Sequence, residues 1–236
     1  MILNQANIDR TCPEKEIYNE VLSLDDKHIL ELGCGAAEIT RDIASNGKNR
    51  VITAFEVDQI QHKKNLQITD LANVSFQSGG AENIPVDDNS QDIVFMFKSL
   101  HHVPNDLLDK AMQEINRVLV PGGFAYISEP IFAGDFNEII RLFHDEQQVR
   151  IAAFKATQRA VDTELFNLHQ EIFFNVTVNF EGFAEFEEKL LNVTHTEHHL
   201  SKELHDSVKS KFEFTFSQNG GQFTAPMRVD LLQSSK

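Results

Sequence analysis

The sequence predicts an α/β fold built on a doubly wound, mostly parallel sheet. Short apolar runs occur at 28–32, 50–56, 74–77, 92–97 and 124–128. Most of them are nearly continuously apolar, as expected for parallel strands that helices cover on both faces. Segments with helical periodicity lie between the runs, and this alternation predicts βαβ units and a parallel sheet.

The helices are expected at 13–24, from about Ala36, at 59–69 and at 106–119. The first follows Pro13, because proline suits the start of a helix. The last carries one apolar stripe of the kind that packs on a sheet, formed by Leu107, Leu108, Ala111, Ile115 and Val118.

The composition predicts a single domain over 1–236 and leaves a small or cationic substrate open. The chain has 236 residues and is 41% hydrophobic, which is enough for one sizeable core with an elaboration. With 21 basic and 36 acidic residues, the net charge is −15, which argues against nucleic acid or an anionic membrane as partner. A monomer or homodimer is expected.

The chain has no targeting segment at its N-terminus and no 18-residue apolar run, so we expect a cytoplasmic protein. Its two cysteines, Cys12 and Cys34, are too far apart in the sequence for a disulfide framework or a zinc-binding spacing.

The central feature is a glycine turn after the first predicted strand. Gly33 and Gly35 permit a tight turn in which the backbone closely approaches a ligand, and Cys34 lies between them. The helix that starts near Ala36 would direct free N–H groups and its positive dipole end toward a carboxylate or phosphate. Strand, Gly-x-Gly and helix together predict a nucleotide-type binding turn.

Two acidic residues narrow the choice of ligand. A dinucleotide fingerprint needs Gly or Ala where this chain has Glu38. Glu31, two residues before Gly33, would repel a phosphate but suits a cationic amine. S-adenosylmethionine carries an ammonium, a sulfonium and one carboxylate, so it fits this turn better than a dinucleotide.

The stretch Ile29–Thr40 closely resembles motif I of the class I S-adenosylmethionine-dependent methyltransferases, Glu/Asp-x-Gly-x-Gly-x-Gly, with Ala37 at the third glycine. Arg117–Gly123, Arg-Val-Leu-x-Pro-Gly-Gly, is also frequent in this family. The resemblance covers 28–130 and is of the type 11/25 kind. It implies a seven-stranded Rossmann-like fold, S-adenosylmethionine as cofactor and S-adenosylhomocysteine as product.

Glu56 ends the second predicted strand, about 20 residues beyond the glycine turn, where an acid can accept hydrogen bonds from ribose hydroxyls. Asp58 is the alternative, but it suits the N-cap of the helix at 59–69 better. After the third strand, Gly80 stands where the family has Asp, so Ala81 N–H and Glu82 would contact the adenine. Glu82 is otherwise an exposed loop acid.

The loop after the fourth strand should face cofactor and substrate, because ligands of open α/β sheets bind beyond the carboxyl ends of the strands. His101 or His102 is the candidate general base, since imidazole titrates near neutrality. Alternatively, one histidine caps the next helix and the other packs against the cofactor. Glu129, at the end of the fifth strand, is a second pocket candidate. The predicted cofactor contacts are Glu31, Gly33, Cys34, Gly35, Ala36, Glu56, Val57, Gly80, Ala81, Glu82 and Lys98.

The chain changes character after Pro130, where 14 of the 19 phenylalanines lie. We expect 131–205 to form a mainly helical cap inserted between strands five and six. Two or three of these phenylalanines would line an apolar pocket and the others would fill its core. Asn219-Gly220 is a strong hairpin signal, so 211–232 should supply the last two strands.

Three functions follow from these motifs. The first is methyl transfer to an oxygen or nitrogen of a small-molecule acceptor, and the second is a non-catalytic or regulatory S-adenosylmethionine-binding module. The third, a nicotinamide oxidoreductase, needs Tyr-x-x-x-Lys. Here Tyr18 and Tyr126 are followed four residues later by Leu22 and Pro130. A DNA base methylase is disfavoured, because no Asn/Asp-Pro-Pro-aromatic sequence follows the fourth strand.

A histidine cluster near the C-terminus has the spacing of metal ligands on a helix. It fits a solvated helix end as well, and we expect no metal. Its members are His195, His198, His199 and His205.

Overall fold

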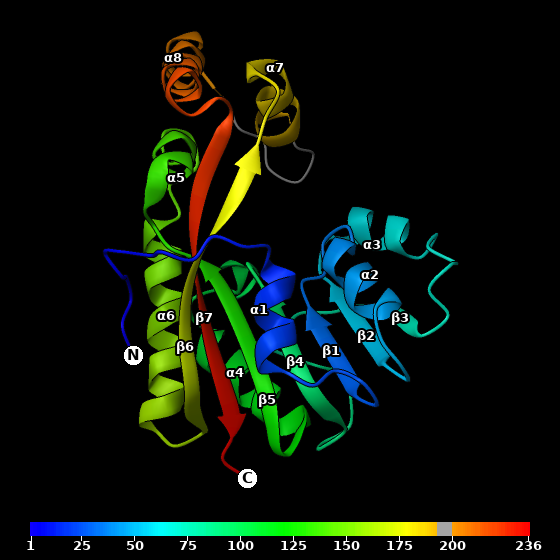
Figure 1. The fold of residues 1–236 in the computed structure, drawn as a ribbon. Coiled ribbons are helices and arrows are strands. Elements are labelled where there is room, and N and C mark those ends of the chain that lie inside the picture. Colours follow the sequence, from blue (N-terminus) through cyan, green and yellow to red (C-terminus); the bar gives the residue numbers. More distant parts are fainter. Residues whose placement is uncertain (193–199) are drawn as a thin grey trace.

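The computed structural model describes residues 1–192 and 200–236. The strands are β1 (His28–Leu32), β2 (Val51–Glu56), β3 (Val74–Ser78), β4 (Gln91–Phe97), β5 (Leu119–Pro130), β6 (Phe166–Asn179) and β7 (Gln222–Ser234). They form one seven-stranded sheet in the order β3-β2-β1-β4-β5-β7-β6 (Figure 1). Strands β1 to β5 pair in parallel, and β7 is antiparallel to both of its neighbours.

The helices on the first part of the chain are α1 (Glu14–Val21), α2 (Glu38–Ser45), α3 (Gln59–Asn65), the 3₁₀ turn η1 (Leu100–His102) and α4 (Leu108–Val118). Those on the second part are α5 (Gly134–Ile140), α6 (Gln147–Asp162), α7 (Phe183–Phe186), the π-helical η2 (Glu187–Leu191) and α8 (Lys202–Asn219). No helix in the described ranges is long and apolar enough to cross a membrane.

Two apolar cores lie on opposite faces of the sheet. Leu30 and Leu32 of β1 point into the core that α4 and α6 cover. Ile29 points into the other core, which α1 and α2 cover. Alternate residues of one strand therefore enter different cores, as the period of two requires for a strand buried on both sides.

The predicted α/β class with a seven-stranded, mostly parallel sheet is confirmed. The first five strands lie where the apolar runs predicted them, and the first spans His28–Leu32 as expected. Asp58 is the N-cap of α3, because its side chain accepts a hydrogen bond from the Ile60 N–H at 2.8 Å. The helix from Ala36 begins slightly later, at Glu38.

The predicted C-terminal hairpin over 211–232 is wrong. Residues 211–216 belong to α8, and Gly220 is the left-handed C-cap of that helix, with φ 65°. A glycine in this conformation ends helices as readily as it turns hairpins, so the Asn-Gly signal alone did not separate the two. The partner of β7 is β6, which lies in the segment predicted as a cap. Helices therefore occur on both sides of β6, and 131–205 is not one insertion.

Strands β6 and β7 extend past β5 and carry a small second lobe at the carboxyl end of the parallel strands (Figure 1). Its core is mostly phenylalanine and joins α5, α7 and α8 to the ends of the two strands. Phe186 and Phe212 are central to it, with ring centroids 4.9 Å apart. Most phenylalanines of the second half thus fill a core.

Phe212→Ala should lower the free energy of unfolding of this lobe by about 3–5 kcal/mol, because a fully buried ring is lost and the rigid surroundings cannot close the cavity. Phe214→Ala, two residues along α8, is the matched control: this ring is 65% exposed. Urea titration followed by near-UV circular dichroism measures both. Equal loss of stability in the two variants would contradict the assigned core.

Candidate functional site

The glycine turn joins the ends of β1, β2 and β4. The N–H groups of Gly33 and Cys34 both donate to the Phe55 carbonyl at 2.9 Å. Gly33 has φ 77°, and a Cβ there would lie 2.7 Å from the Cβ of Ser99. The Ser99 hydroxyl in turn donates to the Leu32 carbonyl at 2.8 Å. The turn therefore needs glycine at 33, both for its backbone angle and for its closeness to the loop after β4.

Glu56 holds the other side of the turn. One carboxylate oxygen accepts the Gly35 N–H at 2.7 Å and the other accepts the Asp58 N–H at 2.9 Å. A Cβ placed on Gly35 would meet no atom within 4 Å, so open space lies over this part of the turn. A buried carboxylate is thus fixed beside an open, glycine-lined surface.

Glu31 is a second buried carboxylate, 2% exposed, and accepts a hydrogen bond from the Thr40 hydroxyl at 2.6 Å. Burial raises its pKa to about 7, and the negative charge of Glu56 acts in the same direction. A nearby cationic group would stabilise the ionised form of Glu31 and lower that pKa again. The pair Glu31 and Glu56 therefore makes this end of the sheet suited to a cation.

Ala37 and Cys34 complete the turn. Ala37, the N-cap of α2, has φ 61°, which lies in the left-handed region that glycine adopts more easily. Cys34 is buried, and the Asn65 side-chain amide donates to the Gly35 carbonyl at 2.8 Å beside it. Burial raises the pKa of the Cys34 thiol, so this cysteine stays protonated and packs against the turn.

The remaining predicted cofactor contacts are Ala36 within the turn and, outside it, Val57, Gly80, Ala81, Glu82 and Lys98. Ala81 is buried, and the Glu82 carboxylate lies next to the Gly80 backbone, where a Cβ would be 2.3 Å from one of its oxygens. Ala36, Val57 and Lys98 are exposed. Residues brought together by direct hydrogen bonds are Gly35 and Glu56 on one side, and Glu31 and Thr40 on the other.

His101 lies buried between two carboxylates. Its Nδ1 makes a short hydrogen bond with Glu129 of β5, and its Nε2 lies 3.5 Å from Glu146, just before α6. The second oxygen of Glu129 accepts the Leu100 N–H at 2.9 Å. Glu129 is thus where the sequence predicted a pocket acid, and its direct partner is His101.

These charges decide the protonation of His101. Burial alone lowers its pKa, but Glu129 and Glu146 outweigh burial and raise the pKa to about 9. His101 is therefore cationic at neutral pH, with its ring nitrogens directed at carboxylates, and is a poor general base. His102 is exposed and contacts it in a tilted arrangement, with ring centroids 4.1 Å apart. Desolvation and the neighbouring His101 lower the pKa of His102, so it stays neutral near pH 7.

His101, His102 and Glu146 bring possible metal-ligand atoms within 4.8 Å of one another. A divalent cation would have to displace the proton from His101 before that ring could bind it. It would also compete with Arg150 for Glu146, because the Arg150 Nη2 lies 2.6 Å from this carboxylate. Of the other histidine cluster, His205 pairs with Glu187 at 2.7 Å. His195, His198 and His199 lie outside the described residues.

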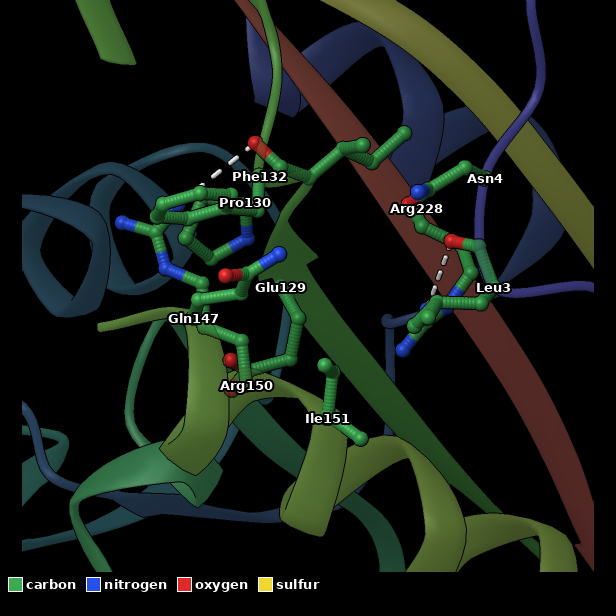
Figure 2. Close-up of a pocket in the computed structure, with 10 residues that line it drawn as sticks. Leu3, Asn4, Glu129, Pro130, Phe132, Gln147, Arg150, Ile151 and Arg228 are labelled. Carbon is green, nitrogen blue, oxygen red and sulfur yellow. Dashed lines mark hydrogen bonds between the residues drawn. The ribbon is translucent and has the colours of Figure 1, made fainter. Parts of the chain in front are cut away.

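A small pocket, with a cavity volume of about 50 Å³, opens where β5, α6 and β7 meet the N-terminal segment. Figure 2 shows side chains from all four elements directed around it, with Glu129 and the two arginines from separate elements. Among the residues that the structure describes, Phe132 is the one phenylalanine that lines it. The lining residues are Leu3, Asn4, Glu129, Pro130, Ile131, Phe132, Gln147, Arg150, Ile151 and Arg228.

Sequence reasoning missed Glu146, Arg150 and Arg228. Glu146 and Arg150 are four residues apart at the start of a helix, a spacing that favours an ion pair. Arg228 and Asp230 are two apart on a strand, so they share one face of an otherwise apolar segment. Both spacings were visible in the sequence, but neither shows that these residues meet His101 or Glu129.

Comparisons with known proteins agree with this geometry. A family described as a methyltransferase domain matches residues 29–123. The chain is 32% identical to a sterol 4-C-methyltransferase of Caenorhabditis elegans over half of its own length and 36% of that protein. It is 30% identical to the methyltransferase YcgJ of Bacillus subtilis over 70% of this chain and 66% of that one. The matches thus span one third to two thirds of these relatives.

Solved structures share the fold. The YcgJ structure has a TM-score of 0.61 with 16% sequence identity, and covers 93% of this chain and 95% of its own. A cyclase, SpnF, has a TM-score of 0.56 with 18% identity, and covers 93% of this chain and 78% of its own. The motif and sheet order together place the chain among the class I S-adenosylmethionine-dependent methyltransferases, of the type 11/25 kind, and it belongs to that family.

The ion pair of His101 with Glu129 should make the free energy of unfolding fall as the pH rises. Because the pKa of His101 is about 9 in the folded protein and 6.5 ordinarily, its contribution is complete below pH 6.5 and is lost as the pH passes 9. The difference corresponds to about 3 kcal/mol. Urea unfolding of wild type and His101→Gln at pH 6, 7.5 and 9 measures it, with the exposed His28→Gln as control. A decline as steep in His101→Gln as in wild type would contradict the assignment.

Proposed function

We propose that the protein binds S-adenosylmethionine at the glycine turn and transfers its methyl group to a small-molecule acceptor. The observation that carries this proposal is the buried Glu31 beside Gly33, with its raised pKa. The cofactor's ammonium would lie near this carboxylate, and its charge would relieve the cost of burying an anion. The open space over Gly35 leaves room for the cofactor backbone.

Glu56 is proposed to hold the ribose. Each of its oxygens already accepts one backbone N–H, which fixes the carboxylate in place and leaves a further lone pair on each oxygen. Ala81 and Glu82 would border the adenine, as the family's motif implies. Gly33, Cys34 and Ala36 would contribute backbone, and Val57 and Lys98 would lie at the edges of the site.

The cofactor supplies an activated methyl group on a sulfonium, so the protein has to position the acceptor in line with it. Positioning alone can supply ~7–11 kcal/mol of the barrier. A general base is needed only for an acceptor that must lose a proton. We assign that task to His102, which is exposed and neutral, and assign His101 the positioning of Glu129 and Glu146.

A small-molecule acceptor is supported by relatives named as sterol, demethylmenaquinone and phosphoethanolamine methyltransferases. Those names describe the relatives, and here they support the class alone. The pocket next to Glu129 has a cavity volume of about 50 Å³, which is room for one small polar group of an acceptor. The acidic composition disfavours nucleic acid. We expect the protein to act in the cytoplasm, as a monomer or homodimer.

Calorimetric titration with S-adenosylmethionine, S-adenosylhomocysteine and NAD tests the proposal. We expect the first two to bind with micromolar affinity and NAD not to bind. Binding of NAD alone would overturn the argument from Glu31 and Glu38. Binding of the first two followed by no labelled methyl transfer to any of a panel of hydroxyl and amine acceptors would favour the regulatory module.

Glu56→Ala should weaken S-adenosylmethionine binding by ~1–3 kcal/mol, the scale of lost hydrogen bonds to a charged group. The matched control is Asp58→Asn, which keeps the N-cap of α3 and removes only the neighbouring charge. Calorimetry on both variants measures the effect. An unchanged affinity in Glu56→Ala would contradict the ribose assignment.

A further inference from the structure

The pocket beside Glu129 contains two guanidinium groups in a protein whose net charge is −15. Arg150 comes from α6 and Arg228 from β7 (Figure 2). Arg228 is only 4% exposed, and the Arg150 side chain is 12% exposed. Burying a guanidinium is costly unless its N–H groups are hydrogen-bonded. Any N–H group of these two arginines that has no partner therefore indicates what a ligand of the pocket would have to accept.

Arg228 is held rigidly but has donor capacity left. Its Nε donates to Asp230 at 3.0 Å, its Nη1 donates to the Leu3 carbonyl at 3.1 Å, and its plane lies over the Phe154 ring at 4.5 Å. Within the described ranges its Nη2 makes no hydrogen bond. The group is therefore fixed by three neighbours while one of its edges remains free to donate.

Arg150 shows the same pattern. Its Nη2 donates to Glu146 at 2.6 Å, and its Nη1 donates to the Asn137 side-chain oxygen at 3.1 Å. Its Nε is buried and has no partner among the residues described. The Asn137 amide nitrogen, on α5, is also buried without a partner. Two hydrogen-bonded side chains thus each keep an unsatisfied N–H donor, and Arg150 is the one of the two that lines the pocket.

The acids around the pocket are mostly committed to other groups. Glu129 accepts from Leu100 and pairs with His101, and Glu146 pairs with His101 and Arg150. Asp230 has one oxygen without a partner, and burial raises its pKa to about 6, so its negative charge is partly suppressed at mildly acidic pH. The groups left to meet a ligand are chiefly N–H donors, which a carboxylate or phosphate would satisfy.

We infer that the methyl acceptor carries a carboxylate or phosphate group, which enters this pocket between Arg150 beside Phe132 and Arg228 beside Leu3. That the bound molecule is the methyl acceptor rests on the proposed function. That the pocket binds an anion does not depend on it. Planar guanidinium groups suit both anions, because they donate two parallel hydrogen bonds. Glu146 connects Arg150 to the histidine pair, so an acceptor anchored here would extend toward His102.

The test follows the arginine Nε–H signals of the full-length protein by NMR, during titration with inorganic phosphate and separately with acetate at constant ionic strength. We expect the Arg150 and Arg228 signals to shift saturably. Arg150→Gln should weaken binding at least tenfold. Arg159→Gln is the matched control, because Arg159 lies on the same helix, is exposed and pairs with Asp109 at 2.6 Å. Arg150→Lys keeps the charge and should give an intermediate affinity.

The result names the anion. If only phosphate saturates the shifts, the acceptor's anionic group is assigned as a phosphate, and if only acetate does, as a carboxylate. If both saturate the shifts, the anion with the lower dissociation constant decides. The inference would be overturned if the shifts did not saturate. It would also be overturned if Arg150→Gln and Arg159→Gln weakened anion binding equally. Thermal unfolding of each variant shows whether it is folded. If Arg150→Gln is not folded, the anion affinity of Arg150→Lys is compared with that of wild type instead.

Binding of S-adenosylhomocysteine, measured on the same samples, separates the two proposals. Arg150→Gln should leave this affinity within about threefold of wild type, because Arg150 has no contact with the glycine turn. Saturable anion binding without S-adenosylhomocysteine binding would defeat the proposed function and keep the anion site. The reverse result would defeat the anion site alone.

Discussion

The buried imidazolium of His101 is the contact on which the proposed acceptor side of the molecule depends. It links η1, just after β4, to Glu129 at the end of β5 and to Glu146 at the start of α6. Glu146 then holds Arg150, so charges of alternating sign run from the sheet to the wall of the pocket. Removing one member would leave a buried charge without its partner, which costs more than the pair itself contributes.

The glycine turn could be predicted from the sequence because its constraints are local. The left-handed Gly33 and the N-cap Asp58 each act within a few residues, and Glu31 and Glu56 lie at fixed places on neighbouring strands. Short apolar runs gave the strand positions for the same reason. The direct link between Glu56 and the Gly35 N–H was not predicted, because it needs the exact placing of two strand ends.

The acceptor side could not be predicted to the same extent, because its residues meet only through the fold. His101, Glu129 and Glu146 come from separate elements, and the pKa of His101 is set by partners 28 and 45 residues away. The residue type alone therefore left His101 and His102 as equal candidates for a base, and only these partners distinguish the two. Gly220 illustrates the other limit: one left-handed glycine serves a hairpin or a helix end, and only packing against the lobe core decides between them.

The two halves of the site also differ in how far relatives inform them. The family match ends at residue 123, whereas Glu129, Glu146, Arg150 and Arg228 all lie beyond it. The glycine turn thus lies in the part of the chain that matches the methyltransferase family, and relatives in that family are named for quite different molecules. The proposal for the acceptor therefore rests on the pocket itself, where unsatisfied N–H donors are the most specific chemical feature.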